Sequence, residues 1–198
     1  CPVVDCNDTD ATVNPAATEG PYGNYTCIDS RDNNCNGLTD AADTVACTPP
    51  PQESLATGEE PTQPGSVVSG DYHQTQASDN AYEEFQEGIF GNTSALVHIW
   101  HFDNVPAGTG HRLHIEGYRP NNTENDNFQL GYTLSIGGTF NSISNATINS
   151  ATETSWDSGT FGASLSGTIY IVIRDTNSAA NKKILDTVFI DQLTIKTP

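Results

Sequence analysis

Oxygen-bearing side chains recur at alternate positions between residues 32 and 43, as they do in loops that wrap around a calcium ion. Gly37 stands at the sixth position, where such a loop needs a sharp turn. Asp43 stands at the twelfth position, where a bidentate Glu is usual, so we expect weaker binding or a bridging water there. Solvated turns are the alternative. The candidate ligands are Asp32, Asn34, Asn36, Leu38 through its carbonyl, Asp40 and Asp43.

A second run of oxygen-bearing side chains lies upstream and has no glycine at its sixth position. Asn7 in this run also begins an Asn-x-Ser/Thr sequon, and one amide cannot easily carry a glycan and ligate a metal. Solvated turns are again the alternative. The candidate ligands are Asp5, Asn7, Thr9 and Asp10, with Glu19 and Asp29 available to complete the shell.

The segment that contains both runs resembles the MopE-type metal-binding repeat of bacterial and archaeal surface proteins. The resemblance rests on Asp5-Cys-Asn-Asp-Thr-Asp-Ala-Thr-Val-Asn-Pro15, on Ala17-Thr-Glu19, on Cys27 and on Asp32-Asn-Asn-Cys-Asn-Gly-Leu-Thr-Asp40. It implies a calcium-ligated module held by disulfides, similar in style to thrombospondin type 3 and dockerin loops. The copper association of the family is not carried over, because this segment has no His, Trp or Met to favour copper.

All five cysteines lie in the first 47 residues, and none has the Cys-x-x-Cys spacing of a zinc or haem site. This density in a segment with few large apolar side chains predicts disulfides, and therefore an oxidising compartment. Cys1 is the odd residue, and it is either lipidated, bonded to another subunit or a product of where the chain was cut. The remaining four are the disulfide candidates, with the pairing left open: Cys6, Cys27, Cys35 and Cys47.

Seven Lys and Arg against 25 Asp and Glu give the chain a formal charge of −18. Nucleic acids and anionic membranes repel such a chain, so neither is expected as a partner. No apolar run approaches the roughly 20 residues of a transmembrane helix. The chain also has no nucleophile elbow, phosphate-binding loop, dinucleotide fingerprint or zinc-protease motif. We therefore expect a protein without enzymatic activity, outside the cell or on its surface.

Composition divides the chain into a Cys-rich module at residues 1–47, a Pro-rich linker at 48–66 and a β domain at 67–198. In the β domain, apolar and polar residues alternate between Gly, Asn and Asp turns, which predicts strands. The predicted fold is mainly β: a jelly-roll-like antiparallel β-sandwich after a small disulfide- and calcium-stabilised module. The segment Thr168–Arg174 is apolar on both faces, so we expect it to be a central strand. The clearest expected strands are Ala95–Asp103, His111–Tyr118, Phe128–Ile136, Thr168–Arg174 and Thr187–Lys196.

Two segments of the β domain, Ser69–Glu84 and Leu185–Asp191, resemble an accessory β-sandwich of secreted bacterial and archaeal proteins. In outline that domain is similar to jelly-roll carbohydrate-binding modules. The resemblance implies a second metal site, a structural calcium between an early acidic strand and the last strand. Solvated carboxylates at strand ends are the alternative. The matching residues are Glu83, Glu84, Asp186 and Asp191.

Four histidines are spaced as two pairs, His98 with His101 and His111 with His114. A hairpin would place His98 opposite His114 and His101 opposite His111. Because residues three apart in a strand point to opposite faces, such a hairpin forms two pairs at most, and two imidazoles make a poor metal site. We therefore expect packed or hydrogen-bonded imidazoles.

Trp156 lies in a polar stretch, where an exposed indole could stack on a sugar ring, with partial burial as the alternative. Trp100 lies in an apolar stretch and is expected in the core. Besides Asn7, four sequons permit glycosylation: Asn24, Asn92, Asn121 and Asn145.

These features favour an extracellular calcium-binding structural protein, a surface or filament subunit that assembles with copies of itself. The unpaired cysteine supports this hypothesis because it invites a covalent partner. A carbohydrate-binding or adhesion module that contacts polysaccharide is the alternative. A copper-handling protein is a third hypothesis, which would require His98 and His114 to act together.

Overall fold

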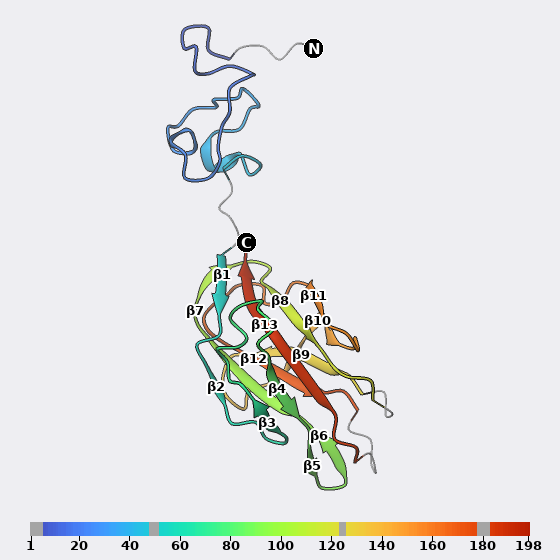
Figure 1. The fold of residues 1–198 in the computed structure, drawn as a ribbon. Helices are drawn as coiled ribbons and strands as arrows, with labels where there is room; N and C mark the ends of the chain where they lie inside the picture. The colour runs from blue at the N-terminus through green and yellow to red at the C-terminus, as the bar shows by residue number, and fades with distance from the viewer. Residues whose placement is uncertain (1–5, 48–51, 123–125, 178–182) are drawn as a thin grey trace. The chain divides into compact units, whose positions relative to one another are not determined.

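The computed structural model describes residues 6–47, 52–122, 126–177 and 183–198. The chain separates into two compact units, residues 1–51 and 52–198 (Figure 1). Among the residues described, no helix is long and apolar enough to cross a membrane.

Over residues 6–47, the first unit consists of loops with two short 3-10 helices, η1 (Tyr25–Cys27) and η2 (Asp40–Ala42). Two disulfides cross-link it, Cys6 to Cys35 and Cys27 to Cys47, which confirms the predicted disulfides and supplies their pairing. In the described part of this unit, the buried apolar groups are Val13 and the second disulfide. Because so little apolar surface is buried, the cross-links carry much of the stability, roughly 3–4 kcal/mol each for loops of 20 and 29 residues.

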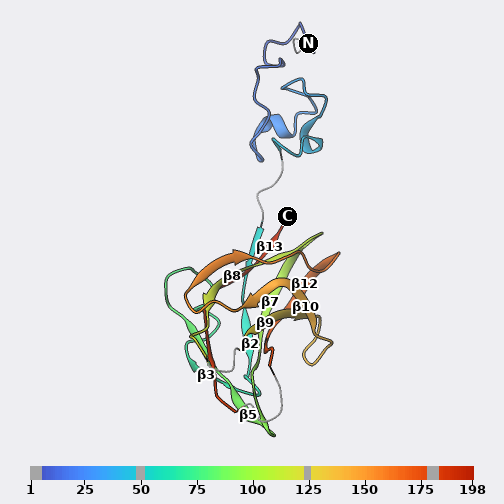
Figure 2. The ribbon, with the colours of Figure 1, turned by 90° about the vertical axis from the view of Figure 1, so that its right-hand side faces the viewer.

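The second unit is a sandwich of two mainly antiparallel sheets that lie face to face, as the turned view in Figure 2 shows. The first sheet runs in the order β11 (Thr154–Asp157), β8 (Arg112–Tyr118), β13 (Thr187–Thr197), β4 (Glu83–Gln86) and β3 (Ser66–Ser69), with β1 (Gln52–Leu55) also paired to β13. The second runs β10 (Asn141–Ile148), β9 (Phe128–Thr133), β12 (Leu165–Asp175), β7 (Val97–Gly108) and β2 (Gly58–Glu60). A separate hairpin joins β5 (Gly88–Phe90) to β6 (Thr93–Ala95). The mainly β class and antiparallel sheets are confirmed.

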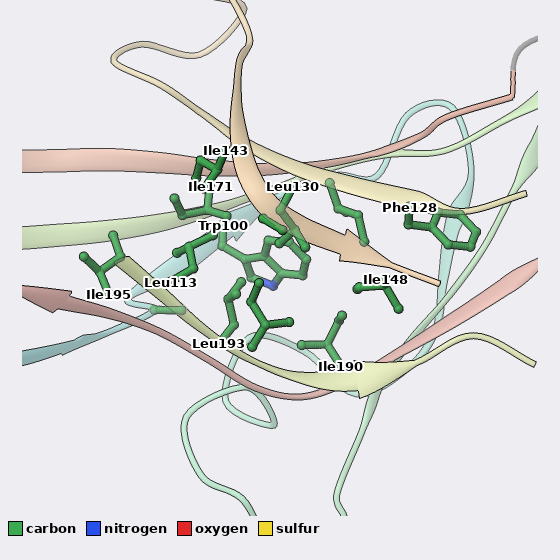
Figure 3. Packing of buried hydrophobic residues seen from close by; sticks show 14 of the residues in the cluster. Trp100, Leu113, Phe128, Leu130, Ile143, Ile148, Ile171, Ile190, Leu193 and Ile195 are labelled. Carbon is green, nitrogen blue, oxygen red and sulfur yellow. The ribbon is translucent and has the colours of Figure 1, made fainter. Parts of the chain in front are cut away.

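Inward-facing side chains of both sheets form one core (Figure 3). Trp100, Leu130 and Ile171 come from the second sheet and meet Leu113 and Leu193 of the first, all of them 0% exposed. Each such side chain contributes roughly 1.5–3 kcal/mol by leaving water. Trp100 is thus a core residue, as expected. Polar side chains that lie next to this core are buried with it.

The expected strands are present with adjusted ends. The segment from Thr168 to Arg174 lies in β12, between β7 and β9 at the centre of its sheet, as predicted. The strand that starts at Phe128 ends at Thr133 instead of at Ile136. Beyond it the chain turns, with the Gly138 amide donating to the Ser135 carbonyl, and this turn leaves Ile136 exposed.

The predicted linker at residues 48–66 is wrong for the part that the structure describes. Residues 52–55 form β1 on the last strand, and residues 58–60 form β2 on β7. Between them Ala56 is 1% exposed, and the amide of Thr57 donates to the carbonyl of His101. Pro61 and Pro64 lie between β2 and β3, where no ladder needs their missing amide, so composition alone could not separate linker from edge strand. Residues 48–51 lie outside the described part.

The predicted histidine hairpin is also wrong, because β7 and β8 belong to different sheets. His98 lies opposite Ile173 of β12, and His114 lies opposite Thr194 of β13. The turn after β7 carries the chain across the sandwich instead of folding it back on the same sheet. The copper hypothesis that needed His98 and His114 together therefore loses its geometric basis.

Candidate functional site

The loop from residue 32 to residue 43 is wound by side chains that accept backbone hydrogen bonds. Asp32 accepts from the amides of Asn36 and Gly37, at 3.0 and 2.7 Å, and the Asn34 side chain accepts from the Asn36 amide at 3.0 Å. The carboxylate of Asp43 closes the loop, because its Oδ2 accepts from the side-chain amides of Asn34 and Asn36, at 3.1 and 2.8 Å. Four of the predicted ligands are therefore linked to one another by hydrogen bonds: Asp32, Asn34, Asn36 and Asp43.

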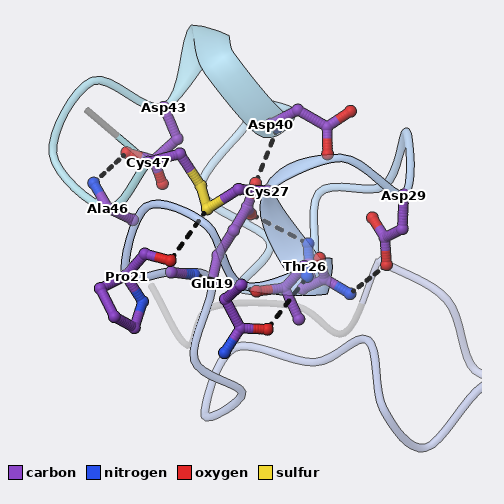
Figure 4. Close-up of a disulfide and its surroundings, with 12 residues drawn as sticks. Glu19, Pro21, Thr26, Cys27, Asp29, Asp40, Asp43, Ala46 and Cys47 are labelled. Atoms are coloured by element: carbon purple, nitrogen blue, oxygen red, sulfur yellow. Dashed lines mark hydrogen bonds between the residues drawn. A yellow bond between two sulfur atoms is a disulfide. The ribbon is translucent and has the colours of Figure 1, made fainter. Parts of the chain in front are cut away.

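Asp43 is 1% exposed, and its second oxygen accepts from the amides of Val45 and Ala46, the latter drawn in Figure 4. Burial raises the pKa of the Asp43 carboxyl, but the hydrogen bonds from Asn36, Ala46, Asn34 and Val45 together hold that pKa below its usual value. The group is thus a carboxylate at neutral pH. A cation could replace the amide donors of Asn34 and Asn36 if the two amides turned their oxygens inward.

Three other predicted ligands brace the backbone beside the second disulfide (Figure 4). Glu19 is 3% exposed and accepts from the amides of Asn33 and Asp40, at 3.1 and 2.8 Å. Asp40 accepts from the amide of Ser30, and Asp29 accepts from the side chain of Asn33. Because these carboxylates hold amide donors of other segments, they fix the fold of the unit around the Asp32 loop.

The upstream run is engaged differently. Asp10 forms an ion pair with Arg31 and also accepts from the amide and hydroxyl of Thr12. Hydrogen bonds from Thr12, and then the charge of Arg31, lower the pKa of Asp10. Asn7 accepts from the amide and hydroxyl of Thr9. The positive partner of Asp10 disfavours a cation there, and Asp5 lies outside the described residues.

The four carboxylates expected to share one site in the sandwich do not come together. Asp186 lies directly before β13 and Asp191 lies within it, so five residues of extended chain place their backbones about 16 Å apart. Glu83 faces the interior and Glu84, its neighbour in β4, faces the other side, where Ser69 donates to it. Three of the four instead join separate acidic clusters, whose other carboxylates the sequence did not single out.

The most enclosed cluster consists of Glu87, Asp126 and Asp186, whose ligand oxygens lie within 4.8 Å of one another. These residues are 2%, 0% and 7% exposed. Both carboxylate oxygens of Asp126 and one of Glu87 are buried without a hydrogen-bond partner. Burial, and then the charges of Asp175, Asp186 and Asp126, raise the pKa of Glu87 to about 7. An all-oxygen, all-carboxylate donor set of this kind fits a hard cation such as calcium.

Backbone contacts explain how this cluster forms. The Glu87 amide donates to the Asp186 carbonyl, and the Asp186 amide donates to Oε2 of Glu87, both at 3.0 Å. Asn122 positions Asp126 by accepting from its amide and donating to its carbonyl. The three carboxylates come from segments far apart in the chain, so no local spacing could have revealed them together.

The cluster around Asp191 joins it to Glu116 and Glu153. The Asp79 amide donates to Asp191 at 3.4 Å, and the Tyr82 hydroxyl donates to Glu153 at 2.9 Å. Burial raises the pKa of the Asp191 carboxyl, and burial together with Glu153 raises the pKa of Tyr82 to about 12. Tyr82 therefore stays protonated and keeps donating to Glu153.

Trp156 borders a hollow of about 360 Å³ between the sheet edges formed by β10 and β11. The indole is half-buried, and its Nε1 donates to the carbonyl of Asn145 at 2.9 Å. Asn145 donates in turn to the carbonyl of Asp157 at 3.1 Å. The remaining lining residues are polar: Asn145, Thr147, Asn149 and Thr154. The site thus combines one fixed aromatic ring with amide and hydroxyl groups.

The sequon asparagines Asn24, Asn92, Asn121 and Asn145 are all exposed, and their glycosylation stays a prediction.

A family model with the description "Putative metal-binding motif", of MopE type, matches residues 5–41, and no curated protein matches the chain. Among solved structures, the chain is similar to TmCBM61 in complex with β-1,4-galactotriose, at 14% identity and a TM-score of 0.41, covering 75% of this chain and 89% of that one. It is also similar to CBM32 of AlyQ in complex with 4,5-unsaturated mannuronic acid (14% identity, TM-score 0.39, covering 73% and 97%). The chain is also similar to CBM35 from Cellvibrio japonicus Abf62, at 15% identity and a TM-score of 0.39, covering 73% of this chain and 91% of that one.

Proposed function

We propose that the chain is part of an extracellular calcium-binding protein whose β-sandwich binds polysaccharide in the hollow beside Trp156. The observation that carries the binding function is this hollow, in which a partly exposed indole is surrounded by uncharged polar side chains. Sugar rings present one apolar C–H face and a rim of hydroxyls, so an aromatic surface with nearby amides and hydroxyls complements them. Binding without turnover is the expected activity.

The hollow is preorganised for such a ligand. Asn145 has a positive φ of 53° within an irregular stretch of β10, and this conformation brings its carbonyl to the indole nitrogen. The ring is thereby held in one orientation before a ligand binds, which lowers the entropic cost of binding. A glycan attached to Asn145 itself would enter the same space, so glycosylation there and polysaccharide binding would exclude each other.

The test is retention of the full chain by a panel of neutral and acidic polysaccharides in affinity gels, with Trp156→Ala and Trp156→Phe. We expect Trp156→Ala to weaken binding at least tenfold, since aromatic contacts of this size contribute about 1.5 kcal/mol or more. Trp156→Phe should retain part of the affinity because it keeps an aromatic ring. Tyr25→Ala, which removes an exposed ring of the first unit, is the matched control and should change nothing. Equal retention of wild type and Trp156→Ala on every polysaccharide would disprove the proposal.

Calcium is the cation that we propose for the Asp32–Asp43 loop and for the Glu87–Asp126–Asp186 cluster. The support is a donor set made of carboxylates and amides, which suits a hard ion that takes six to eight oxygens. Two disulfides in the first unit support an extracellular location, because such bonds persist in oxidising compartments. Self-association into oligomers or filaments, the other hypothesis from the sequence, stays a prediction.

A further inference from the structure

The third acidic cluster contains a histidine and lies inside the sandwich. Glu59 comes from β2, His98 from β7 and Glu83 from β4 of the opposite sheet. The Nε2 atom of His98 lies 3.7 Å from Oε2 of Glu59 and 3.7 Å from Oε1 of Glu83. His98 and Glu83 are both 0% exposed. With both glutamates ionised, none of these three buried atoms has a hydrogen-bond partner, so three ligand atoms converge with no donor between them.

The outward-facing atoms of the two buried residues are, by contrast, satisfied. The Nδ1 atom of His98 lies 2.8 Å from the hydroxyl of Thr62, and the indole Nε1 of Trp100 donates to Oε2 of Glu83 at 2.7 Å. If Nδ1 carries the proton and donates to Thr62, Nε2 presents its lone pair to the cluster. Partners of this kind orient metal ligands in proteins, because they fix the histidine tautomer and the carboxylate rotation.

Without a cation the cluster is electrostatically unfavourable. Burial, and then contact with the Glu59 carboxylate, raise the pKa of Glu83 to about 9, while burial lowers the pKa of His98 to about 3. The imidazole is therefore neutral, and Glu83 carries a proton at neutral pH while no metal is bound. A divalent cation would displace that proton, balance the charges of the two carboxylates that result and take all three atoms as ligands.

We propose that Glu59, Glu83 and His98 bind a divalent transition-metal ion of the zinc class inside the sandwich. Zinc accepts imidazole nitrogen and carboxylate oxygen at about 2.0–2.2 Å, which in a tetrahedral shell separates neighbouring ligand atoms by about 3.4 Å. The observed separations of 3.7 Å need only small side-chain shifts to reach that value. The Glu59 side chain is 24% exposed, so a water molecule can reach the metal from its side as the fourth ligand.

The donor set distinguishes this site from the Glu87–Asp126–Asp186 cluster. Calcium takes oxygen ligands and disfavours imidazole, whereas zinc and cobalt take both. One chain should therefore bind calcium at the Glu87–Asp126–Asp186 cluster and a zinc-class ion at this site at the same time, without competition between the two ions. This inference does not depend on polysaccharide binding or on the Asp32–Asp43 loop.

The test is a titration of the full chain with Co²⁺ in excess calcium, followed by the visible absorption of the bound cobalt and by displacement with Zn²⁺. We expect one equivalent of Co²⁺ with an intense visible band typical of low coordination, which Zn²⁺ abolishes. His98→Gln should remove this cobalt band. Glu59→Gln should weaken binding roughly 100-fold or more. Because Glu59 is partly exposed, its variant keeps the proposal testable if His98→Gln fails to fold.

His73→Gln is the matched control, because His73 forms a surface pair with Asp71 at 2.8 Å and is 59% exposed. Its loss should leave the cobalt band unchanged. Absence of saturable cobalt binding, or binding that survives in both Glu59→Gln and His98→Gln, would overturn the proposal. Loss of the band in His73→Gln would also overturn it, since that result assigns the metal to the surface pair.

Discussion

The effect of Asp126→Asn on the stability of the sandwich should depend on calcium. We expect the substitution to stabilise the calcium-free protein and to destabilise the calcium-bound protein relative to wild type. The carboxylate is 0% exposed, and its oxygens lie within 4.8 Å of those of Glu87 and Asp186. Two unit charges at that separation repel by roughly 3 kcal/mol at an effective dielectric constant of 20. Asp126→Asn keeps the shape and the Asn122 contacts, which involve only its backbone. In chelator at pH 8 we expect the variant to be more stable than wild type by about 1–3 kcal/mol.

With calcium the order should reverse. An ion present at about 1,000 times its dissociation constant stabilises the wild-type sandwich by roughly 4.1 kcal/mol, and the variant should gain little. Tryptophan fluorescence during urea unfolding is the suitable assay, because Trp100 and Trp156 are the two tryptophans of the chain and both lie in the second unit. Glu84→Gln is the control, since its carboxylate faces away from the clusters and should leave the calcium response intact.

Two outcomes would refute this reasoning. If Asp126→Asn gains as much stability from calcium as wild type does, the cluster is not the calcium site. If the variant is less stable than wild type in chelator, the Asp126 carboxylate makes a favourable contact instead of suffering repulsion.

The pH dependence of the calcium-free sandwich gives a further prediction. The pKa of Glu87 is about 7 in the folded state against 4.5 ordinarily, so the folded protein holds a proton that the unfolded chain releases, and stability falls as pH rises through this window. The full shift corresponds to about 3 kcal/mol, which screening and shared protons reduce to about 1–2 kcal/mol. This contribution is the difference in unfolding free energy between wild type and Glu87→Gln, measured by urea unfolding from about pH 4.5 to 8. The same dependence of unfolding free energy on pH in both proteins would contradict the prediction. For self-association, light scattering in millimolar calcium should show assemblies that shrink on chelation, and a monomer of constant size in both conditions would exclude a calcium-dependent polymer.

Local sequence patterns predicted much of the fold. Alternation of apolar and polar residues predicted the segment Thr168–Arg174 as a central strand, since side chains of a strand point alternately to its two faces. Cysteine density predicted disulfides, although the pairing needed three-dimensional proximity. The Asp32–Asp43 loop was also visible in the sequence, because its candidate ligands are close in the chain and their spacing is set by the winding of a single turn.

Contacts between distant segments were not predictable in this way. The interior orientation of His98, its separation from His114 and the meeting of Glu59 with Glu83 depend on which strands pair and how the two sheets stack. The same holds for Glu87, Asp126 and Asp186, which lie on three remote segments.

The sequence by itself thus determined a β-rich, acidic, disulfide-linked chain with one local loop proposed to bind a metal. Only the tertiary structure decided which carboxylates are buried together, because burial and charge proximity are properties of the packed sandwich and have no signature in residue spacing.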